Sequence, residues 1–169
     1  LIPAEDRFAV NERMGANGGV WQPLDEASVE QAIDAIAAGD FASVAVCLLH
    51  APVNDAHERD VAARIRARLP ELPVSLSSEV AREIGEFERM STVAANAYVQ
   101  PIAEQYLSTL DERLSTLDAG GTLDIMLSNG AFTRAELAAR HPIRILESGP
   151  AGGVLSAVNC GLVEGTTCL

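Results

Sequence analysis

Two histidines and a carboxylate follow a strongly apolar run in the first half of the chain. The run SVAVCLL ends at Leu49 and is followed by His50, and then by the pair His57 and Glu58. Imidazole and carboxylate groups bind divalent metals and transfer protons near neutral pH. If the run is a strand and the pair opens a helix, these side chains converge at one edge of a sheet. His50, His57 and Glu58 are therefore a candidate site for a divalent metal, and His50 is a candidate catalytic residue. The alternative is that His57 only decorates the start of the helix.

Glycines in the last quarter of the chain could bring backbone amides close to an anion. The stretch ESGPAGGV at residues 147–154 places a Ser-Gly-Pro turn before a helix whose first turn holds Gly152 and Gly153. Free amides and the positive end of the helix dipole favour a phosphate or a carboxylate there. Tight packing against another helix or a sheet would require the same glycines. The candidate cofactor-binding residues are Ser148, Gly149, Gly152 and Gly153.

Two further glycine turns invite the same question. Ser128, Asn129 and Gly130 follow a predicted strand, where α/β sheets bind ligands, so they are also candidate cofactor-binding residues. Asparagine favours plain turns as well. Residues 118–122 read Asp-Ala-Gly-Gly-Thr, like the phosphate turns of actin-like ATPases, but the preceding LDERLSTL has an amphipathic helical pattern. We interpret this glycine pair as a helix stop.

The elements that must position these residues alternate between helices and strands in the first half of the chain. Alternating apolar residues around the turn signal NGG predict a β-hairpin over residues 7–24. Asp25 caps a helix that Gly39 ends in a left-handed conformation, and Asn54 caps a second helix. Strands are predicted for SVAVCLL and for VSLSSEV at residues 74–80. This order indicates an α/β fold with a parallel or mixed sheet covered by helices.

One long helix dominates the second half of the chain. Only Pro101 interrupts residues 86–117, so we predict a single helix with a kink or restart at that proline. A strand at 123–129 follows, and then a short helix with a capping box formed by Thr133 and Glu136. A strand at 143–147 leads into the final helix.

The composition describes an acidic globular chain. Its 169 residues include 24 acidic and 12 basic side chains, and the net charge is −12. Nucleic acid and anionic membranes repel such a surface, so neither is an expected partner. No apolar tract reaches the roughly 18 residues of a membrane span and no leader pattern is present, so a cytoplasmic protein is expected. Cys47, Cys160 and Cys168 are widely spaced and are expected to be buried thiols.

Four stretches of the chain carry a family likeness. They are VAVCLLHAPVNDAHE at 44–58, EFERMSTVAANAYVQP at 86–101, LSNG at 127–130 and ESGPAGGV at 147–154. Together they resemble the hydantoinase A and 5-oxoprolinase family, which also includes acetone carboxylase β-type subunits. The resemblance covers nearly the whole chain. It implies part of an actin-like ATPase (ribonuclease H-like) architecture, with residues 1–85 in the N-terminal hydantoinase/oxoprolinase region and 86–169 in the hydantoinase A region.

This resemblance implies an ATP-dependent enzyme that phosphorylates the oxygen of a cyclic amide, a lactam or hydantoin, and so prepares the ring for hydrolysis. ATP and Mg²⁺ would be its cofactors, and a hydantoinase B-type subunit or domain its partner. The family's phosphate-binding turns are expected before Leu1 and after Leu169. The chain is then an internal fragment that is inactive alone and binds ATP weakly. Glu86 and Arg89 become candidate catalytic residues facing the substrate, unless they only pair with nearby charges in water.

Other functions remain open on the same residues. Family members that carboxylate a ketone use the same phosphoryl transfer, so a ketone carboxylase subunit is one alternative. A non-catalytic α/β binding or scaffold subunit is another. A third is a separate module that binds a small acidic metabolite at the Ser148–Gly153 turn.

Overall fold

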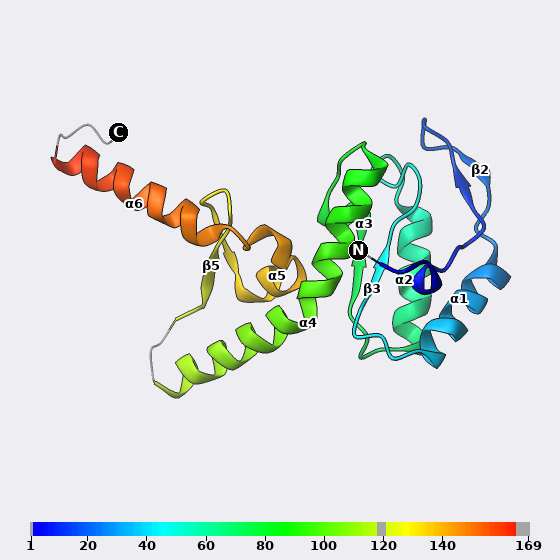
Figure 1. Ribbon diagram of the computed structural model, residues 1–169, viewed down its shortest axis with the longest axis horizontal. Coiled ribbons are helices and arrows are strands. Elements are labelled where there is room, and N and C mark those ends of the chain that lie inside the picture. Colours follow the sequence, from blue (N-terminus) through cyan, green and yellow to red (C-terminus); the bar gives the residue numbers. More distant parts are fainter. Residues whose placement is uncertain (1, 118–120, 165–169) are drawn as a thin grey trace. The chain divides into compact units, whose positions relative to one another are not determined.

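The chain forms two compact units in the computed structural model of Figure 1, which describes residues 2–117 and 121–164. The units are Leu1–Pro101 and Ile102–Leu169, and helix α4 (Glu86–Thr116) runs from the first into the second. Helices and short strands occur in both units, so the predicted α/β class is confirmed. Within the described residues, no helix combines the length and apolar character needed to cross a bilayer.

The first unit contains a hairpin and a helix-covered pair of parallel strands. The hairpin is antiparallel, as predicted, but shorter than residues 7–24. Before α4, the elements of this unit in chain order are the 3₁₀ helix η1 (Ala4–Asp6), β1 (Arg13–Met14), β2 (Val20–Gln22), α1 (Glu26–Ala38), β3 (Val44–Val46), α2 (Ala56–Arg68), β4 (Val74–Leu76) and α3 (Ser77–Val80).

The two faces of the parallel strands β3 and β4 pack differently: one contacts apolar side chains of α1 and α2, and the other makes polar contacts with α4. Side chains alternate between the two faces of a strand. Val74 and Leu76 of β4 point into the apolar cluster with α1 and α2, whereas Ser75 between them accepts a hydrogen bond from Asn96 of α4 at 2.9 Å. Figure 1 accordingly shows α4 on the other side of β3 from α1 and α2. The buried apolar cluster consists of Val29, Ile33, Val46, Val61, Ala62, Ile65, Val74 and Leu76.

Of the two helix caps predicted in this unit, Asp25 is the N-cap of α1, whereas the N-cap position of α2 is Asp55, one residue after the predicted Asn54. The Asp25 carboxylate accepts the Ala27 amide at 3.2 Å at the start of α1, and the Asn54 side chain accepts the Ala56 amide at 3.1 Å at the start of α2. Each of these hydrogen bonds satisfies one of the amides that a helix leaves unpaired at its N-terminus. The left-handed stop predicted at Gly39 is wrong, since its φ is −93°.

The strand predicted for residues 74–80 is too long. It ends at Leu76, and Ser77–Val80 forms the helical turn α3. The reason is a tertiary contact: the Ser77 hydroxyl and the Ser78 amide both donate to Glu58 of α2, at 2.5 and 3.0 Å. Pairing with β3 therefore ends at Leu76, because the next two residues bond to Glu58 instead.

The long helix is confirmed, with Pro101 inside it. It begins at Glu86, so neither Ser91 nor Thr92 caps it, and the Thr92 hydroxyl instead donates to the Glu88 carbonyl one turn back at 2.8 Å. Asp118, Ala119 and Gly120, which belong to the predicted helix stop, lie outside the described residues.

The second unit joins the end of α4 to a small hairpin and two helices. Its hairpin is antiparallel, and α5 packs against both of its strands. The elements after α4 are β5 (Asp124–Met126), β6 (Phe132–Arg134), α5 (Ala135–Arg140), the 3₁₀ helix η2 (Pro142–Arg144) and α6 (Ser148–Glu164).

Two local predictions in this unit are wrong. Thr133 lies in β6 opposite Ile125 and does not cap α5. The strand predicted at 143–147 is absent from this described segment, because Pro142 opens a 3₁₀ turn and the Ile145 amide donates to its carbonyl at 3.0 Å. Helix α6 then begins directly at Ser148, so the Ser-Gly-Pro sequence is the first turn of a helix.

Two glycines of this unit give a matched test of the structure. Gly130 has φ +83°, and a Cβ there would lie 2.6 Å from Leu155 of α6, whereas a Cβ on Gly153 would meet nothing within 4 Å. We expect Gly130→Ala to lower the free energy of unfolding by about 1–3 kcal/mol. Gly153→Ala should raise it by roughly 0.5–1 kcal/mol, because alanine favours a helix. Urea denaturation of both variants measures the difference, and equal effects of one sign would contradict the structure.

Candidate functional site

The carboxyl ends of β3 and β4 form the edge where the polar residues of the first unit gather. Parallel strands place these ends side by side, and α/β sheets bind ligands just beyond them. Cys47 and Leu48 follow β3, and Ser77 and Ser78 follow β4. Glu58 of α2 and Arg89 of α4 reach this edge from opposite faces of the strand pair.

Glu58 is 1 % exposed, and its carboxylate accepts three hydrogen bonds. One oxygen accepts the Leu48 amide at 2.9 Å and the Ser77 hydroxyl at 2.5 Å, and the other accepts the Ser78 amide at 3.0 Å. A buried carboxylate is tolerated only when such hydrogen bonds and an opposite charge replace water. Glu58 therefore ties the ends of both strands to α2.

Arg89 supplies the opposite charge, and it is also 1 % exposed. Its Nε donates to the Ser77 hydroxyl oxygen at 3.0 Å, one Nη to the Leu48 carbonyl at 2.7 Å and the other to the Glu83 carbonyl at 3.2 Å. The Ser77 hydroxyl thus donates to Glu58 and accepts from Arg89. The arginine fixes the start of α4 to the strand ends, and all three of its nitrogens bond inside the protein. A substrate-facing role for Arg89 remains a prediction.

Cys47 lies half-buried beside this network. Burial raises the pKa of its thiol, although hydrogen bonding to Ser77 and the charge of Arg89 act in the opposite direction. A thiol with a raised pKa stays protonated at neutral pH and is a poor nucleophile and metal ligand. Neither thiol is fully buried as expected, since Cys47 is half-buried and Cys160 on α6 is exposed; Cys168 lies outside the described residues.

The predicted metal set is not assembled. His57 Nδ1 lies 2.7 Å from a carboxylate oxygen of Glu12, and Glu58 is engaged by the strand ends. His50 sits in the turn after β3. In residues 2–117 and 121–164, no three histidine, cysteine or carboxylate side chains form a group that could hold a metal ion. His57 and Glu58 are adjacent in sequence but bond to different partners. Their spacing therefore did not predict a shared metal site correctly.

The remaining charged candidate is Glu86, the first residue of α4. Its side chain is exposed, and an acidic residue in the first turn stabilises a helix through the dipole. A catalytic role for Glu86 remains a prediction.

The Ser128–Gly130 segment is the turn between β5 and β6. The Leu127 amide donates to the Ala131 carbonyl at 2.7 Å, and the Asn129 side chain accepts the Ala131 amide at 3.0 Å. Gly130 takes the left-handed position at φ +83°. These contacts explain why the turn has asparagine at 129 and glycine at 130 without requiring a ligand. Cofactor binding here remains a prediction.

The glycines of α6 face different surroundings. A Cβ on Gly152 would lie 3.1 Å from the Met126 sulfur of β5, whereas a Cβ on Gly149 or Gly153 would meet no described atom within 4 Å. Gly152 therefore serves close packing inside the unit. Ser148, Gly149 and Gly153 remain predicted cofactor-binding residues, now in the first turns of a regular helix.

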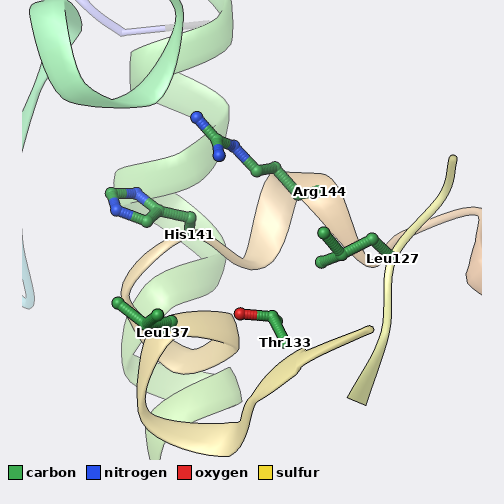
Figure 2. Close-up of a pocket in the computed structure, with 5 residues that line it drawn as sticks. All are labelled: Leu127, Thr133, Leu137, His141 and Arg144. Atoms are coloured by element: carbon green, nitrogen blue, oxygen red, sulfur yellow. The ribbon is translucent and has the colours of Figure 1, made fainter. Parts of the chain in front are cut away.

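The second unit also has a hollow of about 210 Å³ that the sequence did not reveal. In Figure 2, Leu127 and Leu137 lie on opposite sides and the Thr133 hydroxyl points between them, while the Arg144 guanidinium points away from Thr133. The sequence could not reveal this hollow, because Thr133 in its wall lies in β6, a strand that the sequence pattern did not predict. Its lining residues are Leu127, Thr133, Leu137, His141 and Arg144.

Comparison with known proteins identifies the family of this chain. The family described as hydantoinase/oxoprolinase matches residues 89–168, and the hydantoinase/oxoprolinase N-terminal region matches residues 1–69. Caprolactamase subunit alpha of Pseudomonas jessenii is 31 % identical over 96 % of this chain and 23 % of its own length. For 5-oxoprolinase of Saccharomyces cerevisiae the identity is 30 %, over 90 % of this chain and 12 % of the relative.

A solved structure supports the same assignment. The nucleotide-free structure of acetone carboxylase superposes with a TM-score of 0.80 at 25 % identity, over 92 % of this chain and 22 % of the other. The chain thus spans a quarter or less of the length of these relatives. With both regions of one family matched in order along the sequence, the chain belongs to the hydantoinase/oxoprolinase family.

Proposed function

We propose that this chain is part of an ATP-dependent enzyme that opens a cyclic amide ring by hydrolysis. The similarity to caprolactamase subunit alpha over 96 % of the chain carries the proposal, and the similarity to 5-oxoprolinase supports it, since both names describe lactam-opening enzymes. The larger protein would have an actin-like, ribonuclease H-like architecture. Residues 1–85 would belong to its N-terminal region and residues 86–169 to its hydantoinase A region. A cytoplasmic location and a hydantoinase B-type partner belong to the same proposal.

The chemistry explains why such an enzyme needs ATP. An amide carbon is a poor electrophile because the nitrogen lone pair is delocalised onto the oxygen. Transfer of the γ-phosphoryl group to the amide oxygen removes this delocalisation and releases ADP. Water then adds to the ring carbon, the ring nitrogen leaves as the amine, and a second water hydrolyses the acyl phosphate to carboxylate and phosphate.

Phosphoryl transfer depends on positioning and on charges that hold the phosphates. The described residues do not fit a complete magnesium–nucleotide site. They contain no group of three histidine, cysteine or carboxylate side chains that could hold a metal ion, and the buried Arg89 bonds the strand ends. We therefore assign the ATP and Mg²⁺ sites to other parts of the parent protein. This chain would contribute a rigid strand edge and the glycine-bearing start of α6.

One observation favours a second candidate function. The fold similarity to acetone carboxylase, a protein described as ATP-dependent, has a TM-score of 0.80. A ketone carboxylase would use the same phosphoryl transfer to activate the carbonyl oxygen. A scaffold subunit that has lost nucleotide chemistry is a third reading of the same fold.

Turnover of the full-length protein distinguishes these functions. We expect ADP release to depend on a cyclic amide such as caprolactam, 5-oxoproline or hydantoin, with an amino acid as the product. Coupled ADP detection with mass spectrometry of the product measures both. ADP release that requires acetone and bicarbonate would identify the carboxylase instead, and absence of nucleotide turnover under every condition would favour the scaffold.

Titration of the 169-residue chain tests where the nucleotide site lies. We expect calorimetry with ATP and Mg²⁺ to show no binding tighter than roughly millimolar, about −4 kcal/mol, because the phosphate-holding groups are assigned elsewhere. The full-length protein, under identical conditions, is the positive control. Micromolar binding by the 169-residue chain would contradict the assignment.

A further inference from the structure

The turn after β3 contains a strained residue that the proposed function does not explain. His50 has φ +58°, and it is the one non-glycine residue with positive φ in the described part of the chain. Side chains rarely adopt this left-handed conformation, because the Cβ crowds the backbone. Such strain persists only where the surroundings hold the backbone on both sides, and it is concentrated at functional sites.

On the strand side, two buried charged groups hold the chain. The Leu48 amide donates to Glu58 at 2.9 Å, and the Leu48 carbonyl accepts from Arg89 at 2.7 Å. Both backbone groups of Leu48 are therefore fixed two residues before His50. The opposite charges of Glu58 and Arg89 balance beneath the turn, so the strand end offers no net buried cation for a polyphosphate.

On the side that leads into α2, hydrogen bonds hold the turn to itself and to the N-terminal hairpin. The His50 carbonyl accepts the Val53 amide at 3.0 Å and the Asn54 amide at 3.2 Å. The Asn54 side chain accepts the Ala56 amide at 3.1 Å and donates to the Gly18 carbonyl in the hairpin at 2.8 Å. Because Asn54 is bonded in two directions, the turn cannot relax the φ of His50 without breaking its contact with the start of α2 or with the hairpin.

The side chain presented by this turn is half-buried at the carboxyl edge of the strand pair. Its imidazole takes part in none of the hydrogen bonds or ion pairs of the described residues, unlike that of His57, which is paired with Glu12. We propose that His50 contacts the substrate and donates a hydrogen bond from its imidazole to the carbonyl oxygen of the cyclic amide. This inference rests on the proposed function.

Two substitutions separate contact with substrate from a purely structural role. Glycine adopts positive φ freely, so His50→Gly in the full-length enzyme should keep or raise the melting temperature. His50→Ala removes the same side chain but keeps the strain, so its melting temperature should lie below that of His50→Gly. We expect both variants to raise KM for the cyclic amide at least tenfold and to leave KM for ATP unchanged. Val53→Ala, in the same turn with an exposed side chain, is the control and should leave both constants unchanged.

The outcomes distinguish the inference from the function on which it rests. If wild-type enzyme turns over a cyclic amide and His50→Gly keeps the wild-type KM, the contact with substrate is wrong and His50 serves the turn alone. An equal rise in KM for ATP would also overturn it, because the acceptor would then lie on the nucleotide. If the wild-type enzyme turns over no cyclic amide, the proposed function itself is wrong and the inference is lost with it.

Discussion

The buried contact of Glu58 with Arg89 through the Ser77 hydroxyl is the constraint on which the first unit depends. One hydroxyl donates to the carboxylate at 2.5 Å and accepts from the guanidinium at 3.0 Å. Through it, α2, α4 and the ends of both parallel strands are joined at a single point. Removing either side chain leaves buried hydrogen-bonding groups of the other unsatisfied, which costs about 1–3 kcal/mol and more for charged groups. An apolar pair could match its stability, but it could not hold the backbone groups of Leu48.

The same contact shapes the carboxyl edge of the strand pair. Because Glu58 captures the amide and hydroxyl donors beyond Leu76, β4 turns into α3 and its end becomes a rigid corner. Because Arg89 also bonds the Glu83 carbonyl at 3.2 Å, the segment leading into α4 is fixed to that corner. The two buried charges thus fix the backbone at the strand ends, including both backbone groups of Leu48.

Local patterns predicted the elements whose causes are local. The Asp25 cap, the hairpin turn and the long helix through Pro101 each depend on residues a few positions apart, and the structure has all three. The failures have distant causes. The end of β4 depends on Glu58, nineteen residues before Ser77, and the pairing of Thr133 depends on the position of β5. The metal prediction failed similarly, because the partner of His57 is Glu12, 45 residues away.

The first unit encloses an apolar core, although both units also expose large apolar side chains such as Ile84 and Val154. In the first unit, the cluster around Ile33 and Ile65 is closed, with both side chains 2 % exposed. In the second, Val154, Leu155 and Val158 of α6 are each about half exposed or more. Apolar patches of this kind mark surfaces that contact other polypeptide. The first unit therefore carries a rigid strand edge, and α6 of the second unit carries an uncovered apolar surface.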